Sequence, residues 1–185
     1  MKWGPVLPPG RVPSLVDADG DLLATPALTH ERPADPDEVL AELEAQLRRL
    51  RDLGLRVQYV DTHMCFDWLP GVSARLDGLA GHEGLLRPGA RIAPLPPLGR
   101  EVGGAGDPGE ALVARLKAAA PGTYLVVGHP GYDEADMRQF RHAGLGAGEV
   151  ARERDRERRQ FTSPAVLEYA RAGGVEFVRY TDVLR

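Results

Sequence analysis

The sequence predicts an α/β protein with an incomplete (β/α) barrel-like fold and parallel strands. Two observations lead to this prediction. Segments with the composition of buried strands alternate with segments of helical periodicity, and this alternation is typical of parallel sheets. Only about four strands can be counted, whereas a closed barrel has eight and typically needs about 250 residues. We therefore expect one domain, residues 1–185, in which the barrel is incomplete.

The composition excludes several classes of protein. With 43% hydrophobic residues, the chain can bury one sizeable core. A formal net charge of −4 indicates no clustered positive surface, so nucleic acid is not an expected partner. No stretch approaches the roughly 18 apolar residues of a membrane span, and the N-terminus lacks the apolar core of a secretory signal. The single cysteine, Cys65, excludes an internal disulfide and fits a reducing compartment, so we expect a cytoplasmic protein.

Residues 1–34 are predicted to form an irregular segment. They are rich in proline and have no sustained periodicity, so we expect them to lie over another part of the chain. Asp17, Asp19 and Asp21 have the alternating spacing of a calcium-binding loop. However, the glycine is displaced and Leu28 stands where such a loop needs glutamate. We interpret these aspartates as a polar turn.

The first helix is predicted to begin after Asp35. Asp35 has the N-cap position, Pro36 the first helical position and Glu38 the position of a capping box. Apolar residues then recur at helical spacing, and Gly54 follows where a left-handed C-cap is expected. The members of this apolar stripe are Val39, Leu40, Leu43, Leu47, Leu50 and Leu53. The helix should bury one face.

The remaining elements are expected to alternate between strand and helix. VQYVD at 57–61 and TYLVVG at 123–128 have the β-branched and apolar content of strands. Residues 83–109 leave room for little beyond a short strand near Leu85, and a long loop of this kind is often functional. The charged stretch 152–159 is interpreted as a solvated helical face. Further helices are expected at 69–79, 110–119 and 163–172, and VEFVRY at 175–180 predicts a closing strand.

Asp61 and His63 follow directly after the predicted strand at 57–61. In parallel α/β folds, the loops after the carboxyl ends of the strands converge on one rim, so both side chains would point toward it. A neutral imidazole is a common metal ligand, and a nearby carboxylate can bind the metal or orient the histidine. An Asp-x-His pair can equally be a hydrogen-bonded pair within a loop, and both interpretations stay open.

His129 repeats this arrangement after the strand at 123–128. Pro130 and Gly131 make the following turn tight, which would fix the histidine ring and let the backbone approach a ligand closely. A histidine at a turn can instead cap an element or satisfy the core. Two histidines after two strands favour a site.

Three ordered segments make the chain similar to the YdjC/ChbG-like carbohydrate deacetylases. The first is VPSLVDADGDL at 12–22, and the second is AQLRRLRDLGLRVQYVDTHM at 45–64. The third is GHPGYDE at 128–134, followed by an Arg-x-x-Glu pattern at Arg154 and Glu157 and then by FTSP and the closing strand. Because their order and spacing match over nearly the whole chain, the sequence resembles that family.

This resemblance implies a hydrolase that removes N-acetyl groups from a sugar or oligosaccharide with one divalent metal ion, magnesium or zinc. It implies that His63 binds the metal and that Asp61, two positions earlier, is catalytic. His129 matches the histidine of the family's His-Pro-Gly motif and is expected beside the substrate, as a proton donor or an oxyanion partner. The residues expected to bind substrate are Gly131, Tyr132 and Arg154.

The sequence departs from the family pattern in two ways. The family opens with a strand that ends in an Asp-Asp pair, and a later strand supplies another metal-binding histidine. Neither motif is found here, so we expect the C-terminal two-thirds of a YdjC-like deacetylase domain, with activity reduced or lost in this chain alone. Cys65 and Phe66 stand where many relatives carry further histidines, and Cys65 is interpreted as a small loop residue rather than a ligand.

Two other functions stay open. A non-catalytic remnant of the fold could act as a binding or interaction module, and a metal-dependent hydrolase or isomerase of another small molecule could use the same scaffold. Missing strands would leave open sheet edges, so we expect a homo-oligomer. The expected ligand is a small carbohydrate, with no nucleic acid and no membrane as partner.

Overall fold

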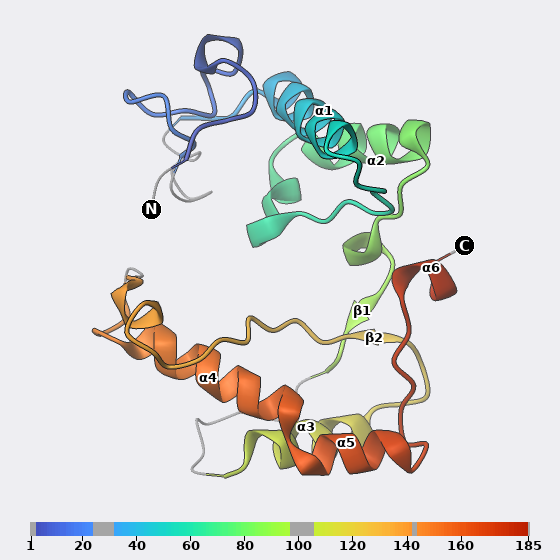
Figure 1. Cartoon of the computed structure of the whole chain (residues 1–185). Coiled ribbons are helices and arrows are strands. Elements are labelled where there is room, and N and C mark those ends of the chain that lie inside the picture. Colours follow the sequence, from blue (N-terminus) through green and yellow to red (C-terminus); the bar gives the residue numbers. More distant parts are fainter. Residues whose placement is uncertain (1–2, 24–31, 97–105, 142–143, 185) are drawn as a thin grey trace. The chain divides into compact units, whose positions relative to one another are not determined.

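The structure of the chain is a computed structural model that describes residues 3–23, 32–96, 106–141 and 144–184 (Figure 1). The chain forms two compact units. The first comprises Met1–Arg91 together with Arg179–Arg185, and the second comprises Ile92–Val178. Each unit is described by itself, and the single domain expected from the sequence stays a prediction.

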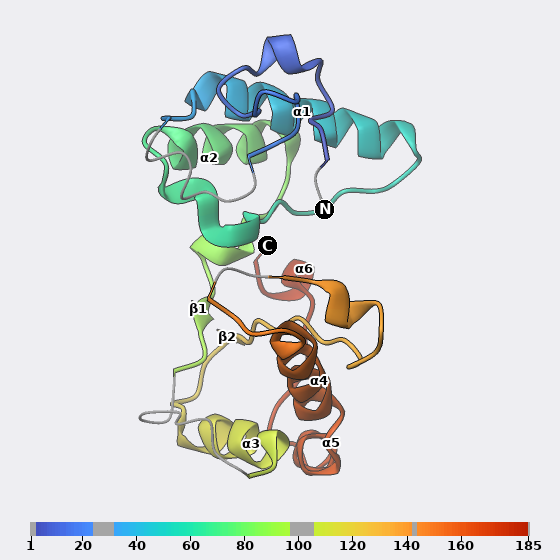
Figure 2. The same ribbon diagram turned by 90° about the vertical axis from the view of Figure 1, so that its left-hand side faces the viewer.

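The first unit is built around two helices that lie alongside each other (Figure 2). Its helices are α1 (Pro36–Asp52), α2 (Val72–Glu83) and α6 (Tyr180–Val183), with the short 3-10 helices η1 (Pro9–Arg11), η3 (His63–Trp68) and η4 (Pro88–Ala90). Between α1 and α2, a small core buries Val39, Leu69 and Val72. The helix predicted at 69–79 therefore forms, but it begins later because Gly71 takes a left-handed conformation with φ 78° at its N-cap.

Helix α1 confirms its predicted start and end. The Asp35 carboxylate accepts a hydrogen bond of 2.8 Å from the backbone N–H two residues on, as an N-cap should. At the other end Gly54 has φ 81°, and the backbone hydrogen bonds there are those of a Schellman motif. The predicted apolar stripe is buried or half-buried as far as Leu47, whereas Leu50 and Leu53 are exposed.

The predicted capping box of α1 is wrong. Instead of bonding the Asp35 backbone, the Glu38 carboxylate accepts a hydrogen bond of 2.7 Å from the Ser14 N–H. The Asp35 N–H in turn donates to the Ser14 hydroxyl at 2.8 Å. A distant serine has therefore replaced glutamate as the acceptor, because the N-terminal segment lies on the start of the helix.

The N-terminal segment lies over α1, as the sequence predicts. Its contact depends on Glu42, a buried carboxylate with a side chain facing the segment. Glu42 accepts hydrogen bonds from the backbone N–H groups of Val6, at 2.8 Å, and Leu7, at 3.0 Å. Val12 is fully buried beneath the same segment. The irregular backbone is thus satisfied by a side chain of the helix that it covers.

The polar turn predicted around Asp17 is confirmed. One oxygen of the Asp17 carboxylate accepts hydrogen bonds from the N–H groups of Asp19, at 2.9 Å, and Asp21, at 3.2 Å. Gly20 has φ 86° within the turn. This is the local side-chain-to-backbone bonding by which aspartate favours turns.

Two predicted strands of the first unit pair with each other, but only briefly. Tyr59 and Leu86 form a parallel bridge, in which the Val60 N–H donates to the Leu86 carbonyl at 2.9 Å and the Leu86 N–H donates to the Gln58 carbonyl at 3.0 Å. The strand expected at 57–61 and the short one near Leu85 are therefore reduced to one parallel contact.

The second unit has a parallel pair of short strands and three longer helices. Its strands are β1 (Ala93–Pro94) and β2 (Tyr124–Leu125), and its helices are α3 (Pro108–Ala118), α4 (Glu149–Thr162), α5 (Pro164–Arg171) and the 3-10 helix η5 (Met137–Gln139). In the parallel pair, Ala93 lies opposite Tyr124. The core of this unit is centred on Leu95, Leu112 and Val166.

The helices predicted in this unit are confirmed. At the start of α3, Asp107 accepts hydrogen bonds of 2.9 Å from two backbone N–H groups. Ser163, which stands at the junction of α4 and α5, donates to the same carboxylate at 3.3 Å. One aspartate therefore joins the start of α3 to the start of α5. The charged stretch 152–159 lies within α4, as expected.

The closing strand predicted at 175–180 is wrong. Residues 175–179 have no regular structure, and Tyr180 begins helix α6. The apolar composition suits a strand, but none of the described strands pairs with these residues, and Phe177 is 76% exposed. A segment rich in β-branched and aromatic residues forms a strand only where a neighbouring strand provides the backbone hydrogen bonds.

The described residues thus form a helix-rich α/β fold in which the named strands pair in parallel. Among these residues, none of the helices combines the length and the apolar character needed to cross a membrane.

Candidate functional site

The residues predicted to form the site are divided between the two units. Asp61 and His63 belong to the first unit, and the segment from His129 to Tyr132 belongs to the second together with Arg154. The two groups are described separately.

Asp61 follows the parallel contact between Tyr59 and Leu86, as the sequence predicts. It is exposed, and one oxygen of its carboxylate accepts a hydrogen bond of 3.0 Å from the next backbone N–H. A Cβ atom added at Gly89 would lie 3.2 Å from that oxygen, so the backbone of η4 approaches it closely. His63 begins η3, and its side chain lies outside the described residues.

Arg87 attaches η3 to α2. Its guanidinium donates to Asp67 of η3 at 3.0 Å and to Asp77 of α2 at 2.7 Å. It also donates to the Ser73 carbonyl at 3.2 Å, and only 9% of the side chain is exposed. A nearly buried cation with three acceptors therefore holds the segment that carries His63.

Tyr180 returns the end of the chain to the same part of the first unit. Its ring lies edge-on to that of Tyr59, with the two centroids 5.0 Å apart. Burial of the phenol raises the pKa of Tyr180, and the negative charge of Asp61 and the neighbouring Tyr59 raise it further. Asp61 is therefore close enough to α6 for its charge to act on this tyrosine.

This raised pKa predicts a loss of stability at alkaline pH. The folded state favours the neutral phenol, so Tyr180 contributes its full stabilisation below the unfolded pKa of about 10. This stabilisation is lost as the pH rises through the higher pKa of Tyr180 in the folded state. We expect Tyr180→Phe to remove this part of the pH dependence, measured by urea unfolding between about pH 9 and pH 11.

Asp61→Asn should lower the pKa of Tyr180 in an ultraviolet titration; an unchanged titration would contradict the proximity of Asp61 to Tyr180.

The segment from Gly128 to Gly131 lies along helix α4. The His129 backbone N–H donates to Glu157 Oε2 at 2.6 Å, and the Gly131 N–H donates to the Arg154 carbonyl at 3.1 Å. A Cβ atom at Gly128 would lie 2.2 Å from Phe161, so the two are already in contact. Arg154, Glu157 and Phe161 are three and four residues apart and share one face of the helix.

Glu157 also faces the ring of His129. The distance from His129 Nδ1 to Glu157 Oε2 is 3.8 Å, which is an ion-pair distance rather than a hydrogen bond. Arg154 Nη1 lies 3.5 Å from the same oxygen. About half of the His129 side chain is exposed, whereas Glu157 is 31% exposed. One carboxylate oxygen thus meets the backbone and the ring of His129 and a guanidinium.

Tyr132 contacts the same helix through Arg158. The Arg158 guanidinium lies over the tyrosine ring, 4.7 Å from its centroid, and also bonds Asp155 at 2.8 Å. In the next residues, the hydrogen bond from Arg138 lowers the pKa of the Asp133 carboxyl, against a small opposing effect of burial. The turn after His129 is therefore surrounded by paired charges.

The comparison with known families follows this geometry. A family model described as YdjC-like protein matches residues 1–172. The chain belongs to the YdjC-like family. The resemblance seen in the sequence motifs is thereby confirmed.

The YdjC-like chain also has a fold similar to that of a solved structure. The match is a crystal structure from Enterococcus faecalis V583 of a protein for which cellobiose-phosphate cleavage is proposed, with a TM-score of 0.65. The two are 19% identical, and the alignment covers 97% of this chain and 72% of that chain. At this identity the likeness is evidence for the fold alone. Among curated proteins, none matches the chain.

In this YdjC-like chain, the two predicted donors suit a metal ion in kind. An imidazole and a carboxylate at His63 and Asp61 are ligand types that zinc accepts, and a carboxylate also suits magnesium. Within the part of the chain that the structure describes, there is no group of three or more histidine, cysteine, aspartate or glutamate residues that could hold a metal. Asp61 is therefore not part of such a group among the described residues.

Sequence reasoning about the YdjC-like chain missed two contacts of the His129 segment. Glu157 belongs to the Arg-x-x-Glu pattern and Phe161 begins the FTSP motif, but neither motif indicated a contact with the turn after His129. The spacing of Arg154, Glu157 and Phe161 could have indicated one common face, since all three lie at helical intervals. What the sequence could not supply is the partner that this face contacts.

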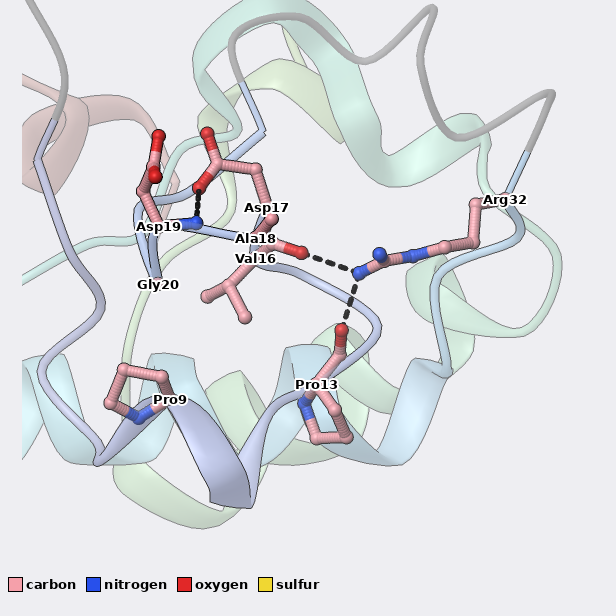
Figure 3. Close-up of a pocket in the computed structure, with 8 residues that line it drawn as sticks. All are labelled: Pro9, Pro13, Val16, Asp17, Ala18, Asp19, Gly20 and Arg32. Carbon is pink, nitrogen blue, oxygen red and sulfur yellow. Dashed lines mark hydrogen bonds between the residues drawn. The ribbon is translucent and has the colours of Figure 1, made fainter.

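An open pocket in the N-terminal segment of the YdjC-like chain lies apart from these residues in the sequence (Figure 3). Arg32 reaches into it and donates to the carbonyls of Pro13 and Val16. Its lining residues are Pro9, Pro13, Val16, Asp17, Ala18, Asp19, Gly20 and Arg32. None of the predicted site residues lines this pocket.

Gly128→Ala is expected to displace the His129 segment from α4. The added Cβ would lie 2.2 Å from a ring carbon of Phe161, and relief of such overpacking costs typically 1–3 kcal/mol. Faster amide exchange at His129 would report the weakened bond to Glu157. Phe161→Leu should restore part of the protection in the double variant, and Gly81→Ala in α2, where a Cβ meets nothing within 4 Å, should leave exchange unchanged. Unaltered exchange in Gly128→Ala would refute this contact.

Proposed function

We propose that this YdjC-like chain is a carbohydrate-processing enzyme that hydrolyses the N-acetyl group of a sugar or oligosaccharide with the help of one divalent metal ion. Membership of the family supports the proposal, as does the fold shared with a protein for which cleavage of a phosphorylated sugar is proposed. The observation that carries it is the pairing of His129 with Glu157, because a histidine held beside a carboxylate and half exposed is equipped to transfer protons.

His129 is assigned the role of proton donor or oxyanion partner. Hydrolysis of an amide requires a proton for the leaving nitrogen and stabilisation of the negative oxygen formed at the carbonyl. Glu157 holds the backbone N–H of His129 and faces its ring at 3.8 Å, while 52% of the side chain remains accessible to a substrate. A carboxylate beside the ring and an accessible ring are both useful in either role.

Tyr132, Gly131 and Arg154 are assigned to substrate binding. Tyr132 is 62% exposed and offers an aromatic surface, which suits the apolar face of a sugar ring. The Gly131 N–H already donates to Arg154, and a Cβ there would lie 2.9 Å from Met137, so Gly131 contributes by its small size. Arg154 offers donors for sugar hydroxyl groups in addition to its contact with Glu157.

The metal would be held by His63, with Asp61 as a catalytic carboxylate beside it. When bound, a magnesium or zinc ion lowers the pKa of water and polarises a carbonyl oxygen. Asp61 is suited to accept a proton because it is exposed and follows a strand end. Arg87 would keep η3, and with it the backbone of His63, in place.

The barrel, the oligomeric state and the cellular location are also part of the proposal. We infer that the parallel contacts belong to an incomplete (β/α) barrel, since β1 and β2 and the Tyr59–Leu86 bridge are all parallel. Unpaired sheet edges favour self-association, so a homo-oligomer is part of the proposal, as is the cytoplasmic location expected from the single cysteine. Sedimentation of the purified chain checks the oligomer, and a strictly monomeric chain would exclude it.

Metal content and acetate release test the function directly. Purified chain is analysed for bound metal and incubated with N-acetylglucosamine and its oligosaccharides. We expect one metal per chain and acetate release at a reduced rate, both abolished in His63→Ala and both retained in His82→Ala, which replaces an exposed histidine of α2. Sugar binding without acetate release would favour the binding-module function instead, and a chain that neither binds metal nor releases acetate would overturn the proposal.

A further inference from the structure

We infer that Glu157 is the positioning residue of His129 and fixes which ring nitrogen of His129 carries the proton in the neutral imidazole. The catalytic role of this arrangement rests on the proposed function. The positioning of His129 itself is inferred only from the contacts of Glu157. Glu157 lies on α4, far from His129 in the sequence. Its Oε2 atom lies near two atoms of His129, the backbone nitrogen and Nδ1.

The backbone contact fixes the position of His129. The hydrogen bond of 2.6 Å from the His129 N–H to Glu157 Oε2 is charge-assisted, and such bonds are stronger than those between neutral groups. The neighbouring bond from Gly131 to the Arg154 carbonyl and the close approach of Gly128 to Phe161 hold the residues on both sides. The Cα atom of His129 therefore has little freedom relative to the helix.

The Glu157 carboxylate also faces the ring, without a hydrogen bond to it. Nδ1 faces the carboxylate at 3.8 Å, and a carboxylate favours a proton on the nitrogen that faces it. A neutral imidazole has one proton, so a proton at Nδ1 leaves Nε2 as an acceptor in that state. In the protonated ring, Nε2 carries a proton that it can donate to a leaving group. This is the part played by the carboxylate of a hydrolase triad, which orients the histidine without exchanging protons itself.

Arg154 is a further partner of the same carboxylate. Its guanidinium lies 3.5 Å from the same oxygen, one helical turn before Glu157. The carboxylate thus has both a guanidinium and the histidine as neighbours, and its 31% exposure protects these contacts partly from water. Other charged side chains of α4 have partners on the helix itself, whereas the Glu157 side chain joins the helix to the His-Pro-Gly turn.

Nitrogen NMR of the His129 ring tests the positioning role without turnover. At a pH where the ring is neutral, we expect the proton mainly on Nδ1 in the unaltered chain. Glu157→Gln keeps an oxygen acceptor for the backbone N–H but removes the charge, so the proton should move mainly to Nε2. Glu153→Gln, the same change on the exposed side of α4, should leave the ring as it was. An Nε2 proton in the unaltered chain would overturn the inference even if Glu157→Gln did not fold.

Kinetics supply the second measurement. We expect Glu157→Gln to lower kcat for acetate release by roughly 10- to 100-fold, with KM changed much less, since the substrate does not contact Glu157. An unchanged kcat together with an unchanged ring would overturn the positioning role. A chain that releases no acetate but shows the movement of the ring proton would support the positioning role and overturn only the deacetylase function.

Discussion

Replacing His129 by alanine is expected to lower kcat for acetate release by a factor of about 10² to 10⁴, the usual contribution of a positioned general acid or base. The variant should fold normally, because the backbone N–H that bonds Glu157 remains and the ring itself is half exposed. The substitution should therefore lower the catalytic rate without lowering the stability of the fold. Steady-state kinetics on an N-acetylated sugar, compared at equal metal content, would measure it.

His82→Ala is the matched control for this change, since it removes an exposed histidine near the end of α2. It should leave kcat within about twofold of the unaltered chain, as expected for a surface substitution away from the site. If His129→Ala retained full activity, the assignment of His129 as proton donor or oxyanion partner would be wrong. A parallel loss in both variants would indicate a general effect on folding.

Arg87→Ala is expected to destabilise the first unit by about 2–3 kcal/mol. The substitution removes a side chain that is only 9% exposed and leaves Asp67 and Asp77 without their common partner. Loss of a fully buried pair would cost more, but Asp77 is 61% exposed and regains water. Both tryptophans of the chain, Trp3 and Trp68, lie in this unit, so tryptophan fluorescence during urea unfolding would follow it selectively.

Arg75→Ala tests whether this loss depends on burial. Arg75 also bonds an aspartate, at 2.6 Å from Asp37, but both side chains are exposed. Exposed pairs of this kind contribute about 0–1 kcal/mol, so the urea midpoint should hardly change. Equal losses in Arg75→Ala and Arg87→Ala would show that Arg87 does not hold η3 in the way described. Lower metal binding in Arg87→Ala alone would connect η3 to the role proposed for His63.

Helix α1 shows what local sequence signals can predict. Its N-cap at Asp35 and its left-handed end at Gly54 depend on residues within one turn of each terminus, and both were predictable. Glu38 was misassigned because its partner, Ser14, is distant in sequence. For the same reason, burial of Glu42 could not be predicted, since the N–H groups that it satisfies belong to the N-terminal segment.

The strands were predictable in composition but not in extent. Residues 57–61 and 123–128 both reach parallel partners, yet each pairs over a shorter length than its apolar content suggests. The run at 175–180 has the same kind of composition and forms no strand. Composition indicates which residues are suited to a buried strand, whereas the length of the strand depends on the neighbouring strand that is available to pair with it.

The second part of the site was predictable as a turn but not as a contact. The sequence around His129 indicated a tight turn after a strand, and Arg154 was singled out from the charges of α4. The Arg-x-x-Glu pattern named Glu157 rather than Glu153, but it did not indicate the partner of Glu157. Only the packing of the turn on the helix identifies that partner as His129.

The pairing of Tyr59 with Tyr180 has a consequence for the order in which the chain is completed during synthesis. About 120 residues separate the two rings along the chain, so at about 5–20 residues per second Tyr59 leaves the ribosome roughly 6–24 s before its partner. The whole of Ile92–Val178 is made in this interval. The unit that is begun first is therefore the unit that is finished last.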